Sequence, residues 1–202
     1  MATTPNVAVG RMPPEIAMPR PRKTTGPDGR EYWVDELGIV MGEVRTDNWR
    51  EDVEQYEERE QVGKLLAHWN WPPNSNVHRP AGGTYDYDCV HADNDDLVAI
   101  EIKRVMLPPE AKRELISTGS TEFKPSGFLE VPALRLAKAN KQLSAATRGA
   151  RRCVLLVAET ELDWAVLVQG VGRANLSAYQ NIDEVWLTTP NFTRFLLHPS
   201  DG

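Results

Sequence analysis

Two stretches in the middle of the chain alternate between apolar and polar residues, as half-buried β-strands do. The first covers residues 85–90, and the second, residues 97–104, follows a polar turn. Because residues two apart on a strand point the same way, Glu101 and Lys103 share one face of the second stretch, and apolar residues line the other. The pattern predicts an antiparallel hairpin with its charged side chains gathered on one face.

Helical patterns flank this hairpin. Asp47 or Asn48 can cap a helix that runs to about Trp69, with acidic residues in its first turns, where the helix dipole favours them. Pro132 begins a second helix that continues to about Thr147 and repeats its apolar residues on one face. We therefore expect helices beside a sheet.

Shorter apolar runs predict the remaining strands. A small hairpin covers residues 30–44, and a short strand lies near Val77. Residues 153–158 are wholly apolar, which is typical of a buried strand in a parallel sheet. Further strands are expected at 164–168 and 184–188. Together the elements predict an α/β fold.

The composition of the segments indicates how the chain is organised. Residues 1–28 are rich in Pro, Arg, Thr and Met, and we expect them to form a flexible arm. Residues 29–202 are interpreted as a single domain with its core at about 50–160. Within that core, residues 105–130 are an insertion, with a short helix at 109–116, that we expect to contact a substrate.

Charge is distributed unevenly along the chain. The 202 residues have a formal net charge of −6, yet residues 103–152 carry 11 basic and four acidic side chains. This basic segment begins at Lys103, two positions after Glu101. Two interpretations are open, namely a surface that follows a phosphate backbone and an ordinary solvated helix surface.

Other features narrow the class of protein. The sequence has no apolar run of membrane-spanning length and no signal peptide with a basic start and an apolar centre. We therefore expect a cytoplasmic protein without a membrane partner. Cys89 and Cys153 lie in separate strand-like runs and are expected to be buried, reduced thiols.

The predicted hairpin gathers several acidic side chains and one amine. Asp86 and Asp88 share a face of the first strand, so pairing of the strands brings them close to Glu101 and Lys103. Carboxylate oxygens of this kind hold Mg²⁺, and an ammonium beside them stabilises charge on a phosphate. The alternative is a solvated strand face, which predicts that Glu101 is exposed and far from Asp88.

The order of the elements and the spacing of these residues resemble the PD-(D/E)xK phosphodiesterase superfamily, which includes restriction endonucleases and Holliday-junction resolvases. The resemblance covers about residues 50–160. It is most specific at Asp88, near the start of one strand, and at the Ile-Glu-x-Lys of residues 100–103 in the next. It implies a restriction-endonuclease-like fold, a central mixed sheet flanked by helices in the order α-β-β-β-α-β.

The resemblance also implies roles for particular residues. Asp88 and Glu101 would be catalytic metal ligands, and Lys103 would orient the attacking water and stabilise charge at the phosphate. A glutamate of the first helix completes the metal shell in many members. Glu60 matches it best here, with Glu57 in reserve.

Further positions are secondary candidates. Asp86 is a spare ligand, and Gln142 matches a Gln-x-x-x-Tyr motif in which this chain has Ala146 instead of the tyrosine. Lys138 is a further phosphate contact in the same helix. The residues expected to contact nucleic acid are basic: Arg104, Arg135, Lys138 and Lys141.

The sequence thus predicts a metal-dependent nuclease that hydrolyses phosphodiester bonds. Mg²⁺ is the expected cofactor, with Mn²⁺ able to replace it, DNA is favoured over RNA as the partner, and a homodimer is compatible with such an enzyme. One alternative is an inactive nuclease-fold subunit that binds nucleic acid or assembles with a partner protein. Another is an unrelated α/β interaction module.

Overall fold

The computed structural model describes residues 20–108, 128–159, 161–188 and 195–198. The chain divides into two compact units, residues 1–57 and 58–202. Within the described ranges the elements are β1 (Arg22–Thr25), β2 (Glu31–Val34), β3 (Val40–Glu43), α1 (Trp49–His68), β4 (Asn76–His78), β5 (Tyr87–Val90), β6 (Leu97–Val105), α3 (Val131–Leu143), β7 (Arg151–Ala158), α4 (Glu161–Val171), a 3-10 turn (Leu176–Ala178), β8 (Glu184–Thr188) and β9 (Phe195–His198).

The first unit is built on an antiparallel sheet in the order β1-β2-β3. The expected hairpin at 30–44 is confirmed by β2 and β3. Trp33 is buried, and its Nε1–H donates to the buried carboxylate of Asp52 at 2.8 Å. The backbone N–H groups of Arg45 and Thr46 donate to the same carboxylate, so one aspartate joins the start of α1 to the sheet.

Strand β1 lies within the segment 1–28 that we interpreted as an arm. It pairs with β2 along its whole length, from Arg22 opposite Val34 to Thr25 opposite Glu31. Its four side chains are exposed, so the alternation that signals a half-buried strand is missing. Backbone pairing to the Tyr32-Trp33 strand forms it instead. Residues 1–19 of the same segment lie outside the described part of the chain.

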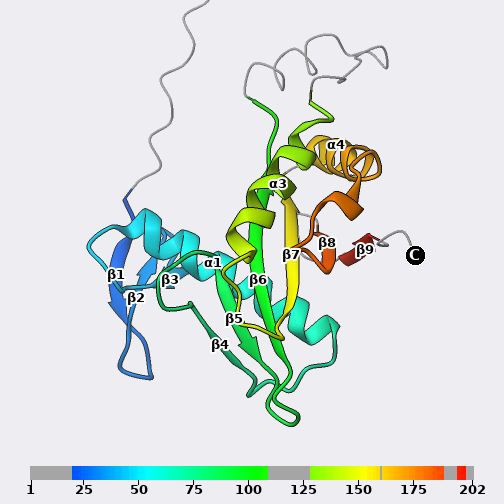
Figure 1. Ribbon diagram of the computed structural model, residues 1–202. Helices are drawn as coiled ribbons and strands as arrows, with labels where there is room; N and C mark the ends of the chain where they lie inside the picture. The colour runs from blue at the N-terminus through cyan, green and yellow to red at the C-terminus, as the bar shows by residue number, and fades with distance from the viewer. Residues whose placement is uncertain (1–19, 109–127, 160, 189–194, 199–202) are drawn as a thin grey trace, which may run out of the picture. The chain divides into compact units, whose positions relative to one another are not determined.

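The second unit contains a mixed sheet, which has the order β4-β5-β6-β7-β8-β9 in the described residues. Strands β4, β5 and β6 are antiparallel, β6, β7 and β8 are parallel, and β9 pairs antiparallel with β8. Strands β6 and β7 therefore occupy the middle (Figure 1). The prediction of an α/β fold with a central mixed sheet beside helices is confirmed.

Each face of this sheet packs against a different helix. The second half of α1 packs Val62, Leu65 and Leu66 on one face, against Ile100 and Ile102 of β6 among others. Helix α3 covers the other face with an apolar stripe, and α4 adds to the same cluster; the residues involved are Leu136, Ala139, Leu143, Leu167 and Val171. The alternation along β6 therefore decides which side chains meet which helix.

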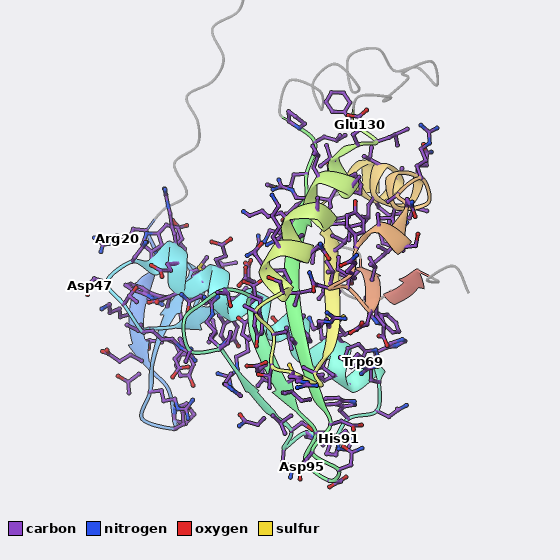
Figure 2. The ribbon with its side chains drawn as sticks, viewed as in Figure 1. Arg20, Asp47, Trp69, His91, Asp95 and Glu130 are labelled. Atoms are coloured by element: carbon purple, nitrogen blue, oxygen red, sulfur yellow. The ribbon has the colours of Figure 1, made fainter. Side chains whose placement is uncertain are left out.

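Aromatic side chains close the α1 face near the β5–β6 turn. Trp69, at the end of α1, contacts Trp186 with ring centroids 5.6 Å apart, and Trp71 contacts His91 at 4.9 Å. Figure 2 labels Trp69 and His91, together with Asp95 in the turn itself. These contacts favour a packing role for both tryptophans.

The prediction of a strand at 164–168 is wrong. These residues belong to α4, in which buried positions recur at helical spacing: Asp163, Val166, Leu167, Gly170 and Val171. A five-residue apolar run fits a buried strand or a buried helix segment equally well, and here the flanking residues extend the helical period. Helix α3 also ends earlier than expected, at Leu143 rather than near Thr147.

The other predicted elements of the second unit are present. The strands near Val77, at 153–158 and at 184–188 correspond to β4, β7 and β8. Of the expected insertion, residues 109–127 lie outside the described residues, and so does the helix proposed at 109–116. No helix in the described ranges is long and apolar enough to span a membrane.

We predict that Gly170→Ala destabilises the second unit. A Cβ at Gly170 would lie 2.6 Å from the carbonyl oxygen of Leu129 and 2.6 Å from Cγ of Pro132, so α4 must move away from α3, at a cost of about 1–3 kcal/mol. Urea unfolding followed by tryptophan fluorescence measures the change. Gly172→Ala is the matched control, because its Cβ meets only ordinary contacts at 3.4 Å and beyond. Equal stability of the two variants would contradict the close approach.

Candidate functional site

The hairpin of β5 and β6 sets the geometry of the candidate site. Tyr87 pairs with Ile100 and Asp88 pairs with Ala99. Directly opposed residues point to the same face, so Asp88 shares the face of Ala99 and hence of Glu101. This is the face that α3 covers. Asp88 and Glu101 therefore lie on the same side of the sheet, as the sequence predicted.

Glu101 is completely buried in the central strand β6. Its Oε1 is paired with the Nζ of Lys103, the next residue on the same face. The backbone N–H of Asp86 also donates to the Glu101 carboxyl group. Its Oε2, in contrast, has no hydrogen-bond partner among the described residues. The prediction of an exposed Glu101, made by the solvated-face alternative, is thus contradicted.

Burial raises the pKa of Glu101 to about 7, and the negative charge of Asp86 contributes in the same direction. The Lys103 ammonium opposes the rise but does not cancel it. Near neutral pH the carboxyl group is therefore poised between its protonated and ionised forms. An additional positive charge beside it would favour the ionised form.

Asp86 lies closer to the centre of this arrangement than the sequence suggested. It stands in a bend just before β5, where continued pairing would set it opposite Glu101. Its Oδ2 accepts the backbone N–H of Ile102 at 2.7 Å. The Asp86 carboxylate is therefore bound to the backbone of β6 at Ile102, next to Glu101, and the Asp86 backbone in turn faces the Glu101 carboxyl group. In the sequence analysis Asp86 is only a secondary candidate, because the alternation of residues does not reveal the bend.

Asp88 is buried beside the side chains of Tyr85 and His78. The hydroxyl of Tyr85 donates to its Oδ1 at 2.8 Å, and Nε2 of His78, opposite it on β4, lies 3.9 Å from Oδ2. Burial raises the pKa of Tyr85, and the neighbouring Thr147 acts in the opposite direction. Tyr85 is a site residue that the sequence analysis missed.

The acidic residues expected from α1 are not brought to these carboxylates. Glu60 is exposed and pairs with Lys64 at 2.9 Å, one helical turn away. Glu57 is exposed and belongs to the first unit. The structure instead turns Glu58 inward, where it accepts a hydrogen bond from Arg79 at 3.1 Å.

Arg79 connects Glu58 to the start of β5. Its guanidinium lies 5.5 Å from the ring centroid of Tyr87, which faces α1. Burial lowers the pKa of Arg79, but the contact with Tyr87 and the charges of Glu58 and Asp86 outweigh it and raise the pKa above its usual value. Residues 57–60 contain three glutamates, and the sequence pattern does not indicate which of them faces inward.

The expected nucleic-acid contacts occupy different surfaces. Arg104 lies on the opposite face of β6 from Glu101 and pairs with Glu159 at 3.4 Å. On α3, Lys138 and Lys141 are exposed and Arg135 is partly exposed. Gln142 is partly buried, and its Oε1 has no partner in the described residues. None of the lysines of α3 is buried beside the carboxylates.

The donor set at Glu101 suits a hard divalent cation. Mg²⁺ takes oxygen ligands and is often held by one or two carboxylates, with substrate phosphates and water completing its shell. Asp86 and Glu101 supply such a pair, and Oε2 of Glu101 is a buried acceptor with no donor in the described part of the chain. Across the described ranges, no group of three or more His, Cys, Asp or Glu side chains is close enough to hold a metal.

Comparisons with known proteins do not identify a relative. No family model, curated protein or solved structure matches this chain. The assignment of site residues therefore rests on the motif in β5 and β6 and on the contacts of Asp86, Glu101 and Lys103.

We predict that Glu101 makes the stability of the protein depend on pH. The folded chain keeps a proton on Glu101 up to about pH 7, whereas the unfolded chain releases it near 4.5. Stability should therefore fall as pH rises from about 4.5 to about 7, by at most about 3 kcal/mol, and then level off. Urea unfolding in metal-free buffer should show this slope in the wild type and not in Glu101→Gln.

Glu60→Gln is the control for this experiment, because it removes an exposed glutamate from the same unit. We expect it to keep the wild-type slope between pH 4.5 and 7. Parallel stability profiles for the wild type and Glu101→Gln would show that Glu101 ionises normally in the folded chain.

Proposed function

We propose that this chain is a metal-dependent nuclease that hydrolyses phosphodiester bonds of DNA. The observation that carries the proposal is the buried Glu101 carboxylate. One of its oxygens is paired with Lys103, and the other has no hydrogen-bond partner among the residues that the structure describes. Asp86 and Asp88 are on the same hairpin. The order α1, β4, β5, β6, α3 and β7 fits the α-β-β-β-α-β core of a restriction-endonuclease-like fold.

The free-energy cost of this arrangement supports a functional role. An ionisable group buried without full hydrogen bonding costs on the order of 1–3 kcal/mol or more. Apolar residues of similar volume would pack the centre of β6 at no such cost, as Ile100 and Ile102 do on the other face. Carboxylates with raised pKa values are concentrated at functional sites.

Each residue of the proposed site has a different role in the reaction. Asp86 and Glu101 would hold Mg²⁺, which polarises a phosphoryl oxygen and lowers the pKa of a coordinated water. Lys103 carries its ammonium on the same face, where it can stabilise the negative charge that develops on the phosphate. Asp88, held by Tyr85, adds negative charge at the base of the site.

A second candidate is an inactive nuclease-fold subunit that binds nucleic acid or a partner protein. One observation favours it: within the described residues, no three potential ligands converge on one point. In that case Glu101 and Lys103 form a structural ion pair. The two candidates differ in whether the protein cleaves nucleic acid that it binds.

We predict that the wild type cleaves supercoiled plasmid in the presence of Mg²⁺ or Mn²⁺. Lys103→Ala and Asp86→Asn should each lower the cleavage rate by about 10²-fold or more, the usual effect of removing a preorganised charge. Asp88→Asn should lower it no more than Asp86→Asn does. Gel assays of plasmid, single-stranded circles and RNA measure the rates and the substrate preference.

Arg173→Ala is the matched control, because Arg173 is exposed and lies after α4, away from the hairpin. We expect it to retain wild-type activity. Equal activity of the wild type and the site variants would exclude the assigned site. A folded wild type that binds nucleic acid without cleaving it would favour the inactive subunit.

A further inference from the structure

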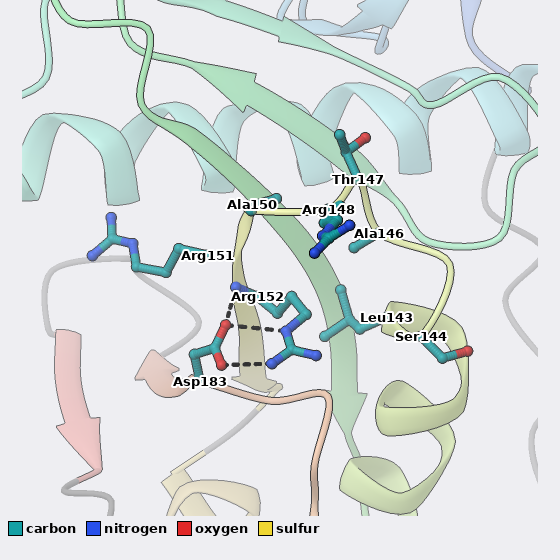
Figure 3. A pocket seen from close by; sticks show the side chains of 10 residues that line it. Leu143, Ser144, Ala146, Thr147, Arg148, Ala150, Arg151, Arg152 and Asp183 are labelled. Carbon is teal, nitrogen blue, oxygen red and sulfur yellow. Dashed lines mark hydrogen bonds and ion pairs between the residues drawn. The ribbon is translucent and has the colours of Figure 1, made fainter.

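A pocket of about 500 Å³ lies beside the end of α3 and the start of β7. Its wall is the turn that joins the two elements, and Asp183 closes one side (Figure 3). The lining residues are Leu143, Ser144, Ala146, Thr147, Arg148, Gly149, Ala150, Arg151, Arg152 and Asp183. Of these residues, Thr147 also lies beside Tyr85 of the carboxylate site described above.

The pocket is lined by three arginines and one acidic residue. Arg152 donates to both carboxylate oxygens of Asp183, at 2.8 and 3.1 Å, as Figure 3 shows. Arg151 pairs with Glu184 at 2.9 Å and lies over the ring of Trp69. Two of the three positive charges are therefore matched by a neighbouring carboxylate.

Arg148 differs from the other two arginines. It is exposed, and it makes no hydrogen bond or ion pair with the described part of the chain. It follows Thr147 in a turn in which the N–H of Ala150 donates to the carbonyl of Thr147, and Gly149 adopts a φ of +90°. The turn thus holds an unmatched guanidinium at the pocket wall.

The sheet register connects this pocket to the candidate carboxylates. Arg152 on β7 is opposite Ala99 on β6, and Ala99 is opposite Asp88 on β5. All three share the α3 face, and adjacent strands are about 4.8 Å apart, so Arg152 and Asp88 have Cα atoms roughly 10 Å apart. Thr147 in the pocket wall also contacts the Tyr85 hydroxyl that donates to Asp88.

We infer that the pocket binds a phosphate group of the nucleic-acid backbone that flanks the scissile phosphate, with Arg148 as its cationic contact. Guanidinium groups bind phosphate oxygens in a bidentate manner, and contacts of this kind position a strand without reading its sequence. The inference rests on the proposed function, because the pocket lies one strand beyond the hairpin that would hold the scissile bond.

The test is the binding of a fluorescein-labelled oligonucleotide, as duplex and as single strand, to the full chain in EDTA. Arg148→Ala should weaken binding at least fivefold. It should also lower the slope of log K against log salt by about 0.9 for duplex or 0.7 for single strand, the change expected for one lost phosphate contact. Arg148→Lys should keep most of the slope. Arg173→Ala, which removes an exposed arginine elsewhere, should change neither quantity.

Unchanged affinity and salt slope in Arg148→Ala would overturn the inference. Inorganic phosphate, added at constant ionic strength, tests whether the pocket binds free phosphate or a phosphate of the nucleic-acid backbone. If it binds the wild type but not Arg148→Ala while both bind the oligonucleotide equally, the pocket takes free phosphate and the inference is also wrong.

The same experiment separates this inference from the proposed function. If the wild type never cleaves nucleic acid but its binding still depends on Arg148, the phosphate pocket is supported and the nuclease proposal is wrong. If the wild type cleaves nucleic acid and Arg148→Ala changes neither the affinity nor the cleavage rate, the nuclease proposal is supported and the phosphate pocket is wrong.

Discussion

The arrangement of the second unit depends on one ion pair, between Glu101 and Lys103, in the central strand of its sheet. Central strands are normally apolar on both faces, because water cannot reach their side chains. Here β6 is apolar only toward α1, and toward α3 it carries a fully buried glutamate. The backbone N–H of Asp86 and the Lys103 ammonium stabilise that charge only in part. Among the described residues, nothing donates a hydrogen bond to the remaining oxygen, Oε2.

The register between β5 and β6 determines the face of the sheet on which Glu101 lies. A slip of one residue between β5 and β6 would move Glu101 to the apolar face that packs against Val62 and Leu65 of α1. The hydrogen bond from the N–H of Ile102 to Asp86 fixes the register at the point where regular pairing ends. Asp86 therefore both holds the register and is a candidate ligand.

The sequence was sufficient to predict the hairpin and the face that carries Glu101 and Lys103, because alternation along a strand is a local property. The sequence was not sufficient where tertiary packing determines the orientation and the partners of a side chain. The inward turn of Glu58 rather than Glu60 depends on Arg79, which is 21 positions from Glu58 in sequence. The pairing of Arg152 with Asp183 spans an even longer stretch of sequence, 31 positions. The prediction of a strand at 164–168 was wrong for another reason, because a short apolar run fits a strand and a helix equally well.

Local charge explains how an acidic chain can present a phosphate-binding surface. The net charge of −6 counts side chains that neutralise one another in pairs, such as Arg152 with Asp183 and Arg151 with Glu184. Within the described residues, the groups left without such a partner include the guanidinium of Arg148 and one carboxyl oxygen of Glu101. A phosphodiester strand bridged to the carboxylates by a divalent cation, with its next phosphate at the arginine, would match both charges on one face of the sheet.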